Sequence, residues 1–179
     1  MPCDRVDIAM HIAVHDLVTS LSGLDRAGLT DRLARAAATV TGTAYAGFVR
    51  VDPLREVARL VHVHGPPGDP LRVRPWLTES GVLKILTVSP GSARLPRDPS
   101  VGEPGFLATP VPLATREHVL IWVAGRAFRD CDEHLLSRLA TAAGRALEAA
   151  SGMEAAVRIL RAVHTFTGGW PPPPRRPSE

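Results

Sequence analysis

The stretch from Gly81 to Ala150 decides the fold. It begins with Gly81-Val-Leu-Lys-Ile-Leu86, continues through a loop rich in proline and glycine, and reaches Phe106-Leu-Ala-Thr-Pro-Val111. A tight turn leads into Val119-Leu-Ile-Trp-Val123, and Phe128-Arg-Asp-Cys-Asp-Glu133 then opens a segment rich in alanine and leucine. The spacing of the apolar residues predicts a short helix, a loop, two antiparallel strands and a long final helix, in that order.

The sequence before this stretch predicts two helices and a β-hairpin. Apolar residues recur at helical spacing over 6–21 and again over 29–40. Residues 44–51 form a strand that is apolar on both faces, which predicts cover on both sides of the sheet. Residues 56–64 form the return strand, and the prolines and glycines of 65–75 predict an irregular loop.

Three local features complete the expected order of elements. Thr78 to Leu86 is the short helix, with Thr78 or Ser80 as its N-cap. Ser92 to Leu95 is a weak strand. Pro110 and Pro112 remove two backbone donors, so the strand that contains them is expected to be irregular or unpaired on one side.

The final helix is expected to outgrow the domain. Asp130 and Glu133 have the spacing of a capping box at its start. Apolar residues then recur in alternating steps of three and four, as in a helical dimer, and a helix from Asp130 to Thr165 would be about 50 Å long. The alternative is a break at Ser151-Gly152, with the second half folded back on the domain. The residues predicted at a dimer interface are Leu139, Ala146, Met153, Val157 and Leu160.

Five short motifs carry a resemblance to one family. They are Thr43-Ala-Tyr-Ala-Gly-Phe48, Val61-His-Val-His-Gly65, Gly81-Val-Leu83, Phe106-Leu-Ala-Thr-Pro-Val111 and Phe128-Arg-Asp-Cys-Asp132. In this order they resemble the first strand, the end of the second strand, the short helix, the "FLGVPV" strand and the start of the last helix of a GAF domain. The resemblance is closest to the GAF modules of actinobacterial redox- and gas-sensing histidine kinases.

The resemblance implies an α+β fold of three layers. A central antiparallel sheet of about five strands is expected, with the N- and C-terminal helices on one face and a short helix plus loops on the other. The expected division is an N-terminal helix at 1–22, the GAF-like domain at 23–150, an extension of the last helix at 151–166, and a disordered Pro-rich tail at 167–179.

The resemblance also implies a small-molecule pocket. Its predicted lining is Phe48, His62, His64, Trp76, Leu83, Phe106 and Trp122. Some related modules hold haem on a histidine just before the FLGVPV strand, but residues 96–105 contain no histidine. Haem is therefore disfavoured, although His62, His64 and His118 leave it open. Bulk at Ala108-Thr109 and Ile121-Trp122 could instead fill the pocket.

Charge and composition exclude other classes. The formal net charge of +3 arises from 21 Lys and Arg against 18 Asp and Glu, interspersed along the chain, so no nucleic-acid-binding face is predicted. No apolar stretch is long enough to span a bilayer, and no signal peptide is expected. Two cysteines, Cys3 and Cys131, without the spacing of a disulfide framework fit a reducing cytoplasm.

Motifs for metal binding and catalysis are weak. His62 and His64 share one face of a strand, and His11 and His15 share a helical face, but neither pair has a third ligand nearby. Cys131, in the first turn of the last helix, is the candidate for a redox-sensitive thiol. One branch of the GAF family reduces free methionine sulfoxide, but it depends on several cysteines.

We therefore expect a non-enzymatic, cytoplasmic sensory or regulatory domain. It would bind an unknown small molecule or respond to redox state, form a homodimer, and signal through its terminal helices to a separate output protein. The alternative is a degenerate GAF scaffold with a filled pocket that serves only protein–protein interaction. A thiol switch or redox enzyme at Cys131 is a third, weaker alternative. No cofactor, metal, nucleic acid or membrane partner is expected.

Overall fold

The computed structural model describes residues 26–88, 91–115 and 117–167, with 160–167 described by backbone alone. The predicted helix at 1–22 and the tail from residue 168 onward lie outside these residues. The helices are α2 (Arg26–Thr41), α3 (Val73–Glu79), α4 (Val82–Val88), the short 3₁₀ helix η2 (Pro99–Val101) and α5 (Asp130–Thr167). The strands are β1 (Tyr45–Asp52), β2 (Val57–His64), β3 (Ala93–Asp98), β4 (Glu103–Val111) and β5 (His118–Ala124).

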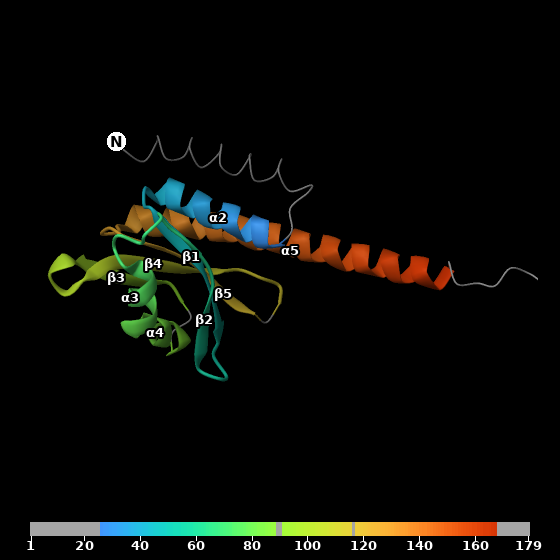
Figure 1. Cartoon of the computed structure of the whole chain (residues 1–179), viewed down its shortest axis with the longest axis horizontal. Coiled ribbons are helices and arrows are strands. Elements are labelled where there is room, and N and C mark those ends of the chain that lie inside the picture. Colours follow the sequence, from blue (N-terminus) through green and yellow to red (C-terminus); the bar gives the residue numbers. More distant parts are fainter. Residues whose placement is uncertain (1–25, 89–90, 116, 168–179) are drawn as a thin grey trace, which may run out of the picture.

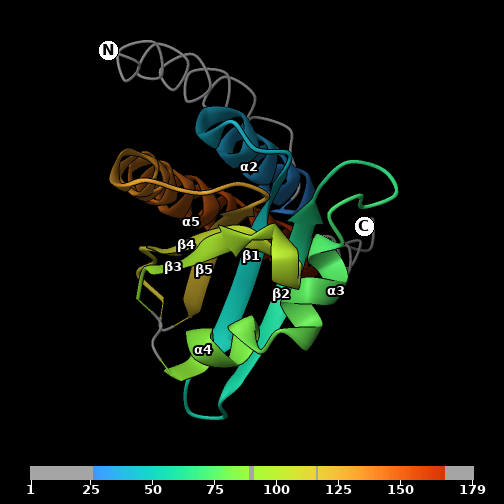
Figure 2. The same ribbon diagram turned by 90° about the vertical axis from the view of Figure 1, so that its left-hand side faces the viewer.

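The five strands form one antiparallel sheet in the order β2-β1-β5-β4-β3. Helices α2 and α5 pack side by side on one face of this sheet, and α3 and α4 cover part of the other (Figures 1 and 2). The predicted three-layer α+β architecture is confirmed, with two short helices where one was expected.

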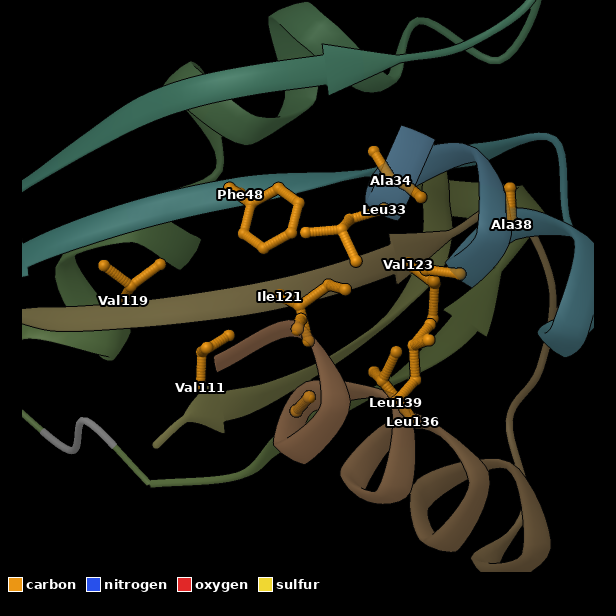
Figure 3. Packing of buried hydrophobic residues seen from close by; sticks show 14 of the residues in the cluster. Leu33, Ala34, Ala38, Phe48, Val111, Val119, Ile121, Val123, Leu136 and Leu139 are labelled. Atoms are coloured by element: carbon orange, nitrogen blue, oxygen red, sulfur yellow. The ribbon is translucent and has the colours of Figure 1, made fainter. Parts of the chain in front are cut away.

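Both faces of the sheet are buried around its central strand β5, which is apolar and buried at every position from Val119 to Ala124. In β5, Val119, Ile121 and Val123 face α2 and α5, while the alternate residues Leu120 and Trp122 face α3 and α4. Two separate apolar clusters result, here called the α2–α5 core and the α3–α4 core. In the α2–α5 core, side chains from α2, β1, β5 and α5 converge (Figure 3).

The predicted helix from Thr78 to Leu86 is interrupted at Ser80-Gly81 and becomes α3 and α4. Ser80 is the C-cap residue of α3, and its hydroxyl also accepts a hydrogen bond at 3.3 Å from the N–H of Val82, the first residue of α4. Strand β3 is longer than predicted and reaches Asp98. Its pairing with β4 ends at Ala108, so the missing N–H of Pro110 costs no bond to β3.

Helix α5 runs without interruption through Ser151-Gly152. Among its described side chains, the last buried one is Leu147, which packs in the α2–α5 core. The twenty residues from there to Thr167 correspond to about 30 Å of helix. Figure 1 shows this part of α5 projecting beyond the rest of the described chain.

Candidate functional site

An aromatic stack fills the space between the sheet and the helices α3 and α4. The rings of Trp76 and Phe106 lie 5.7 Å apart between centroids, and those of Phe106 and Trp122 lie 6.1 Å apart and nearly parallel. Phe106 and Trp122 are fully buried, whereas Trp76, on α3, is partly exposed. The stack therefore occupies the region in which the sequence predicted a pocket.

Trp122 lies directly over Gly47 of the neighbouring strand. A Cβ at Gly47 would come within 2.7 Å of the indole ring, so only glycine leaves room for it. No described residue accepts a hydrogen bond from the indole Nε1 of Trp122, although that atom is buried. The stack therefore contains a polar group whose burial is uncompensated by any described residue, which is costly.

The hollow in this region lies outside the stack, between α3 and the β3–β4 hairpin. It has a volume of about 670 Å³ and lies beside the exposed edge of Trp76. Figure 2 shows α3 and the hairpin side by side. We call this hollow the α3–hairpin groove. Its walls are residues of 70–80 on one side and of 97–104 on the other.

Four charged side chains line the α3–hairpin groove. Arg72 and Glu79 belong to the α3 wall, and Arg97 and Glu103 to the hairpin wall. Within the described chain, none of the four lies within 4.0 Å of an opposite charge. The sequence did not indicate any of these four residues as site residues, because charged side chains in and near Pro-rich loops usually face solvent and bind nothing.

The α3 wall is held in place by hydrogen bonds to Tyr45 and Asp69. The Tyr45 hydroxyl accepts a hydrogen bond from the Leu71 N–H at 3.1 Å, and the Asp69 carboxylate accepts from the N–H groups of Val73 and Arg74, both at 2.9 Å. Burial acts to raise the pKa of Asp69, but the N–H donors of Arg74 and Val73 outweigh it and hold that pKa below its usual value. Burial raises the pKa of Tyr45. The loop before α3 is therefore preorganised.

The hairpin wall is fixed in a similar way. Asp98 accepts hydrogen bonds from the backbone N–H of Ser100 at 3.0 Å and from its hydroxyl at 2.5 Å, and Pro99 begins η2. The hydrogen bond to the Ser100 hydroxyl and that to its N–H lower the pKa of Asp98. Both walls thus keep their backbone shape without help from the groove's four charges.

The seven predicted pocket residues divide between the two faces of the sheet. Trp76, Phe106 and Trp122 form the stack, and Leu83 packs beside it from α4. Phe48 belongs to the α2–α5 core on the opposite face. His62 and His64 pair in register with Phe48 and Ala46, so they face the same side as Phe48. The structure therefore does not bring the seven together around one cavity.

His62 and His64 lie at the side of α2. The Nε2 atom of His62 is 3.3 Å from the Asp31 carboxylate, which also pairs with Arg35 at 2.7 Å. His118 begins β5 opposite Val51, whose side chain belongs to the α3–α4 core. These three histidines therefore do not converge on a common space. No group of three His, Cys, Asp or Glu within the described ranges could hold a metal ion.

Arg126 connects the sheet to both terminal helices. Its guanidinium donates to the carbonyl of Thr41, the last residue of α2, at 2.5 and 2.9 Å. It also forms a two-pronged pair with the Asp132 carboxylate, at 2.6 and 3.1 Å, in the first turn of α5. Burial alone would raise the pKa of Asp132, but Arg126 and the N–H of Arg129 hold it below its usual value.

The other side of Arg126 contacts the hairpin wall of the α3–hairpin groove. Gly105 directly follows Pro104, has φ +77°, and approaches the Arg126 carbonyl so closely that a Cβ would lie 2.1 Å from it. The Gly125 N–H donates to the Gly105 carbonyl at 3.2 Å. The hairpin is thus packed against the backbone of Arg126, whose side chain contacts both α2 and α5.

The predicted interface residues lie at different depths. Leu139 is fully buried in the chain's own core, and Ala146 is partly buried against it. Met153 and Val157 are 68% and 37% exposed on the projecting part of α5, and the side chain of Leu160 lies outside the described residues. Cys131 is an exposed free thiol in the first turn of α5.

Comparisons with known proteins place the fold. No protein-family model and no curated protein matches the chain. Among solved structures, the chain is similar to the GAF domain of a putative sensor histidine kinase from Pseudomonas syringae pv. tomato, with a TM-score of 0.59, 18% identity, and coverage of 87% of this chain and 96% of that one. It is also similar to the GAF-B domain of DevS from Mycobacterium smegmatis, with a TM-score of 0.51, 22% identity, and coverage of 73% and 98%.

A third similar structure is an enzyme. Free methionine-R-sulfoxide reductase from Neisseria meningitidis, solved with its substrate, has a TM-score of 0.58 and 13% identity, with coverage of 86% of this chain and 94% of that one. Sequence identities as low as these establish architecture rather than activity. No helix in the described part of the chain is long and apolar enough to cross a membrane. The chain has a GAF fold.

Proposed function

We propose that this chain is a non-enzymatic sensory or regulatory domain of the cytoplasm. It binds a small molecule or responds to redox state, and it signals through a homodimer formed by its terminal helices to a partner protein. The observation that carries the proposal is the projecting part of α5. Met153 and Val157 are exposed there at a spacing of four residues, and a helix with an apolar stripe in water favours a partner for that stripe.

A second copy is the simplest partner for this stripe. Met153 and Val157 continue the seam that begins with Leu139, Ala143 and Ala146 inside the domain. Ala155 lies on the opposite side of the helix, since two residues correspond to about 200° of rotation. Two such helices would bury their seams against each other, as in a coiled coil.

The ligand site of this proposal is the α3–hairpin groove. Its hairpin wall leads directly to Gly105 and Arg126, and Arg126 holds the end of α2 and the start of α5. A ligand that shifts the hairpin would change the contacts of Arg126 and so the relative placement of the two helices. This is a population shift between two packings, driven by the ligand's preference for one of them.

The alternative function is an interaction scaffold without a ligand. The aromatic stack favours it, because Trp122 and Phe106 are fully buried and fill the space between the sheet and α3. In that case, α5 would still form the dimer, while the α3–hairpin groove would be an unused hollow.

Native mass spectrometry of freshly purified protein, with an optical spectrum of the same sample, separates the two functions. A dimer that retains a small molecule supports sensing, and an apo dimer that binds nothing supports the scaffold. Light scattering after gel filtration then tests the interface in the double variant Met153→Asp/Val157→Asp. We expect monomers from this variant and dimers from the matched control Ala155→Asp. A double variant that remains dimeric would refute the α5 interface.

A further inference from the structure

We propose that the α3–hairpin groove takes a dipolar ligand, a small molecule with a cationic and an anionic group on an otherwise apolar body. Free amino acids and short peptides have this chemistry. The inference rests on the proposed ligand-binding function and narrows it to a class of ligand.

The first argument is the arrangement of charge. Each wall of the groove carries one arginine and one glutamate: Arg72 and Glu79 on the α3 wall, Arg97 and Glu103 on the hairpin wall. The four charges sum to zero. A purely anionic or purely cationic ligand would meet as much repulsion as attraction, whereas a dipolar ligand can satisfy both signs at once.

The second argument is that these charges are uncommitted. Ion pairs occur elsewhere in the described chain, as between Arg94 and Asp130 at 2.6 Å. The four groove charges face one hollow and yet form no pair among the described residues. A ligand would therefore gain charge-assisted hydrogen bonds without first breaking an ion pair in the protein.

The third argument concerns the apolar body of the ligand. Trp76, which is partly exposed, lines the groove together with Leu71 and Val101, which are 41% and 69% exposed. These side chains offer apolar surface to the body of a ligand. The volume of about 670 Å³ lies within the range of about 300–1,000 Å³ that is usual for small-molecule sites.

The fourth argument is preorganisation. The α3 wall is fixed by Tyr45 and Asp69, and the hairpin wall by Asp98 and its neighbouring prolines. Binding would therefore cost little entropy for ordering the walls of the groove, which favours affinity for a ligand.

The test compares matched probes by isothermal titration on the full chain. The dipolar probes are L-leucine, L-phenylalanine and the dipeptide leucyl-phenylalanine, which separate a free amino acid from a peptide as the source. The monopolar probes are L-phenylalaninamide, which is only cationic, and N-acetyl-L-phenylalanine, which is only anionic. We expect at least one dipolar probe to bind, and its monopolar derivatives to bind about tenfold more weakly or less.

Single substitutions test whether both signs act. Arg97→Gln and Glu103→Gln are each expected to weaken the dipolar probe about tenfold, because each removes one charge-assisted contact. The control Arg59→Gln changes an exposed arginine on β2, outside the groove lining, and should bind as the wild type does.

Three results would overturn the proposal: no dipolar probe binds, monopolar probes bind equally well, or both glutamine variants bind like the wild type. Native mass spectrometry distinguishes this failure from failure of the proposed function. A retained ligand without dipolar charge overturns the ligand class and leaves sensing intact, whereas an apo protein that binds no probe overturns the ligand class and favours the scaffold function.

Discussion

Gly47→Ala should destabilise the domain by about 2 kcal/mol, because β1 and β5 approach each other closely at this glycine. The new Cβ would lie 2.1 Å from the carbonyl oxygen of His62 and 2.7–2.8 Å from two indole carbons of Trp122. Neither neighbour can retreat easily, since the carbonyl belongs to the paired strand β2 and the indole is buried against Phe106.

The magnitude follows from two opposing terms. Forcing a methyl group into a packed core costs about 1–3 kcal/mol, and backbone contact as close as this belongs at the upper end. Alanine also restricts the unfolded chain more than glycine does, which stabilises the folded state by about 0.4–1 kcal/mol. The net effect of about 2 kcal/mol corresponds to a fall in Tm of about 4–8 °C for a domain of this size.

Urea unfolding followed by far-UV circular dichroism measures the loss, and near-UV circular dichroism reports the displaced tryptophan. Gly152→Ala is the matched control, because a Cβ there would meet nothing within 4 Å and alanine favours a helix by about 1 kcal/mol. In a Trp122→Leu background, the cost of Gly47→Ala should shrink but persist, since the contact with the His62 carbonyl remains. A Gly47→Ala protein within about 0.5 kcal/mol of the wild type would refute the packing described for β1 and β5.

Three further outcomes are expected. The pKa of Asp132 is lowered in the folded state, so the ionised carboxylate stabilises the fold fully above its ordinary pKa of about 3.9, and this stabilisation is lost as the pH falls toward the folded value. Asp132→Asn should therefore lower the free energy of unfolding by about 1–3 kcal/mol near pH 7. It should also weaken the fall of stability with decreasing pH, measured by urea unfolding at a series of acidic pH values. Tyr45→Phe removes the acceptor for the Leu71 N–H and should cost about 1 kcal/mol, with faster amide exchange at Leu71; unchanged exchange there would contradict the role given to Tyr45. Cys131→Ser should change the free energy of unfolding by no more than about 0.5 kcal/mol, and oxidant should leave dimerisation of this variant unchanged. A wild-type dimer that responds to oxidant while the Cys131→Ser dimer does not would support a thiol switch at this residue.

The fold was predictable from the sequence because its signals are local and repeated. Apolar residues on both faces of 44–51 predicted cover on both sides of the sheet, and the division of the neighbours Phe48 and Val49 between the two cores confirms it. Pro110 predicted a strand that is irregular or unpaired on one side, and the pairing of β4 with β3 ends at Ala108, before this proline. The start of α5 at Asp130 follows from its acidic first turn.

The site was less predictable, because sequence gives the residues of a strand but not the face on which each lies. The predicted pocket mixed Phe48, His62 and His64 with Trp76 and Trp122, and these two groups lie on opposite faces of the sheet. The alternation of a strand groups His62 with His64. The alternation does not tell which face of the sheet the two histidines are on, because that depends on where helix α2, distant in sequence, packs.

The burial of Trp122 bears on where a ligand could bind to this domain. A ligand that replaced the aromatic stack would have to displace a fully buried indole, which costs about 3–5 kcal/mol in lost packing before any contact is gained. A ligand in the α3–hairpin groove avoids that cost, since Trp76 lines the groove but the buried Phe106 and Trp122 do not. The hairpin next to that groove is also the element that contacts Arg126, and Arg126 binds the end of α2 and the start of α5. If this domain senses a ligand, the shortest route to its helices therefore begins at the edge of the sheet rather than beneath α3 and α4.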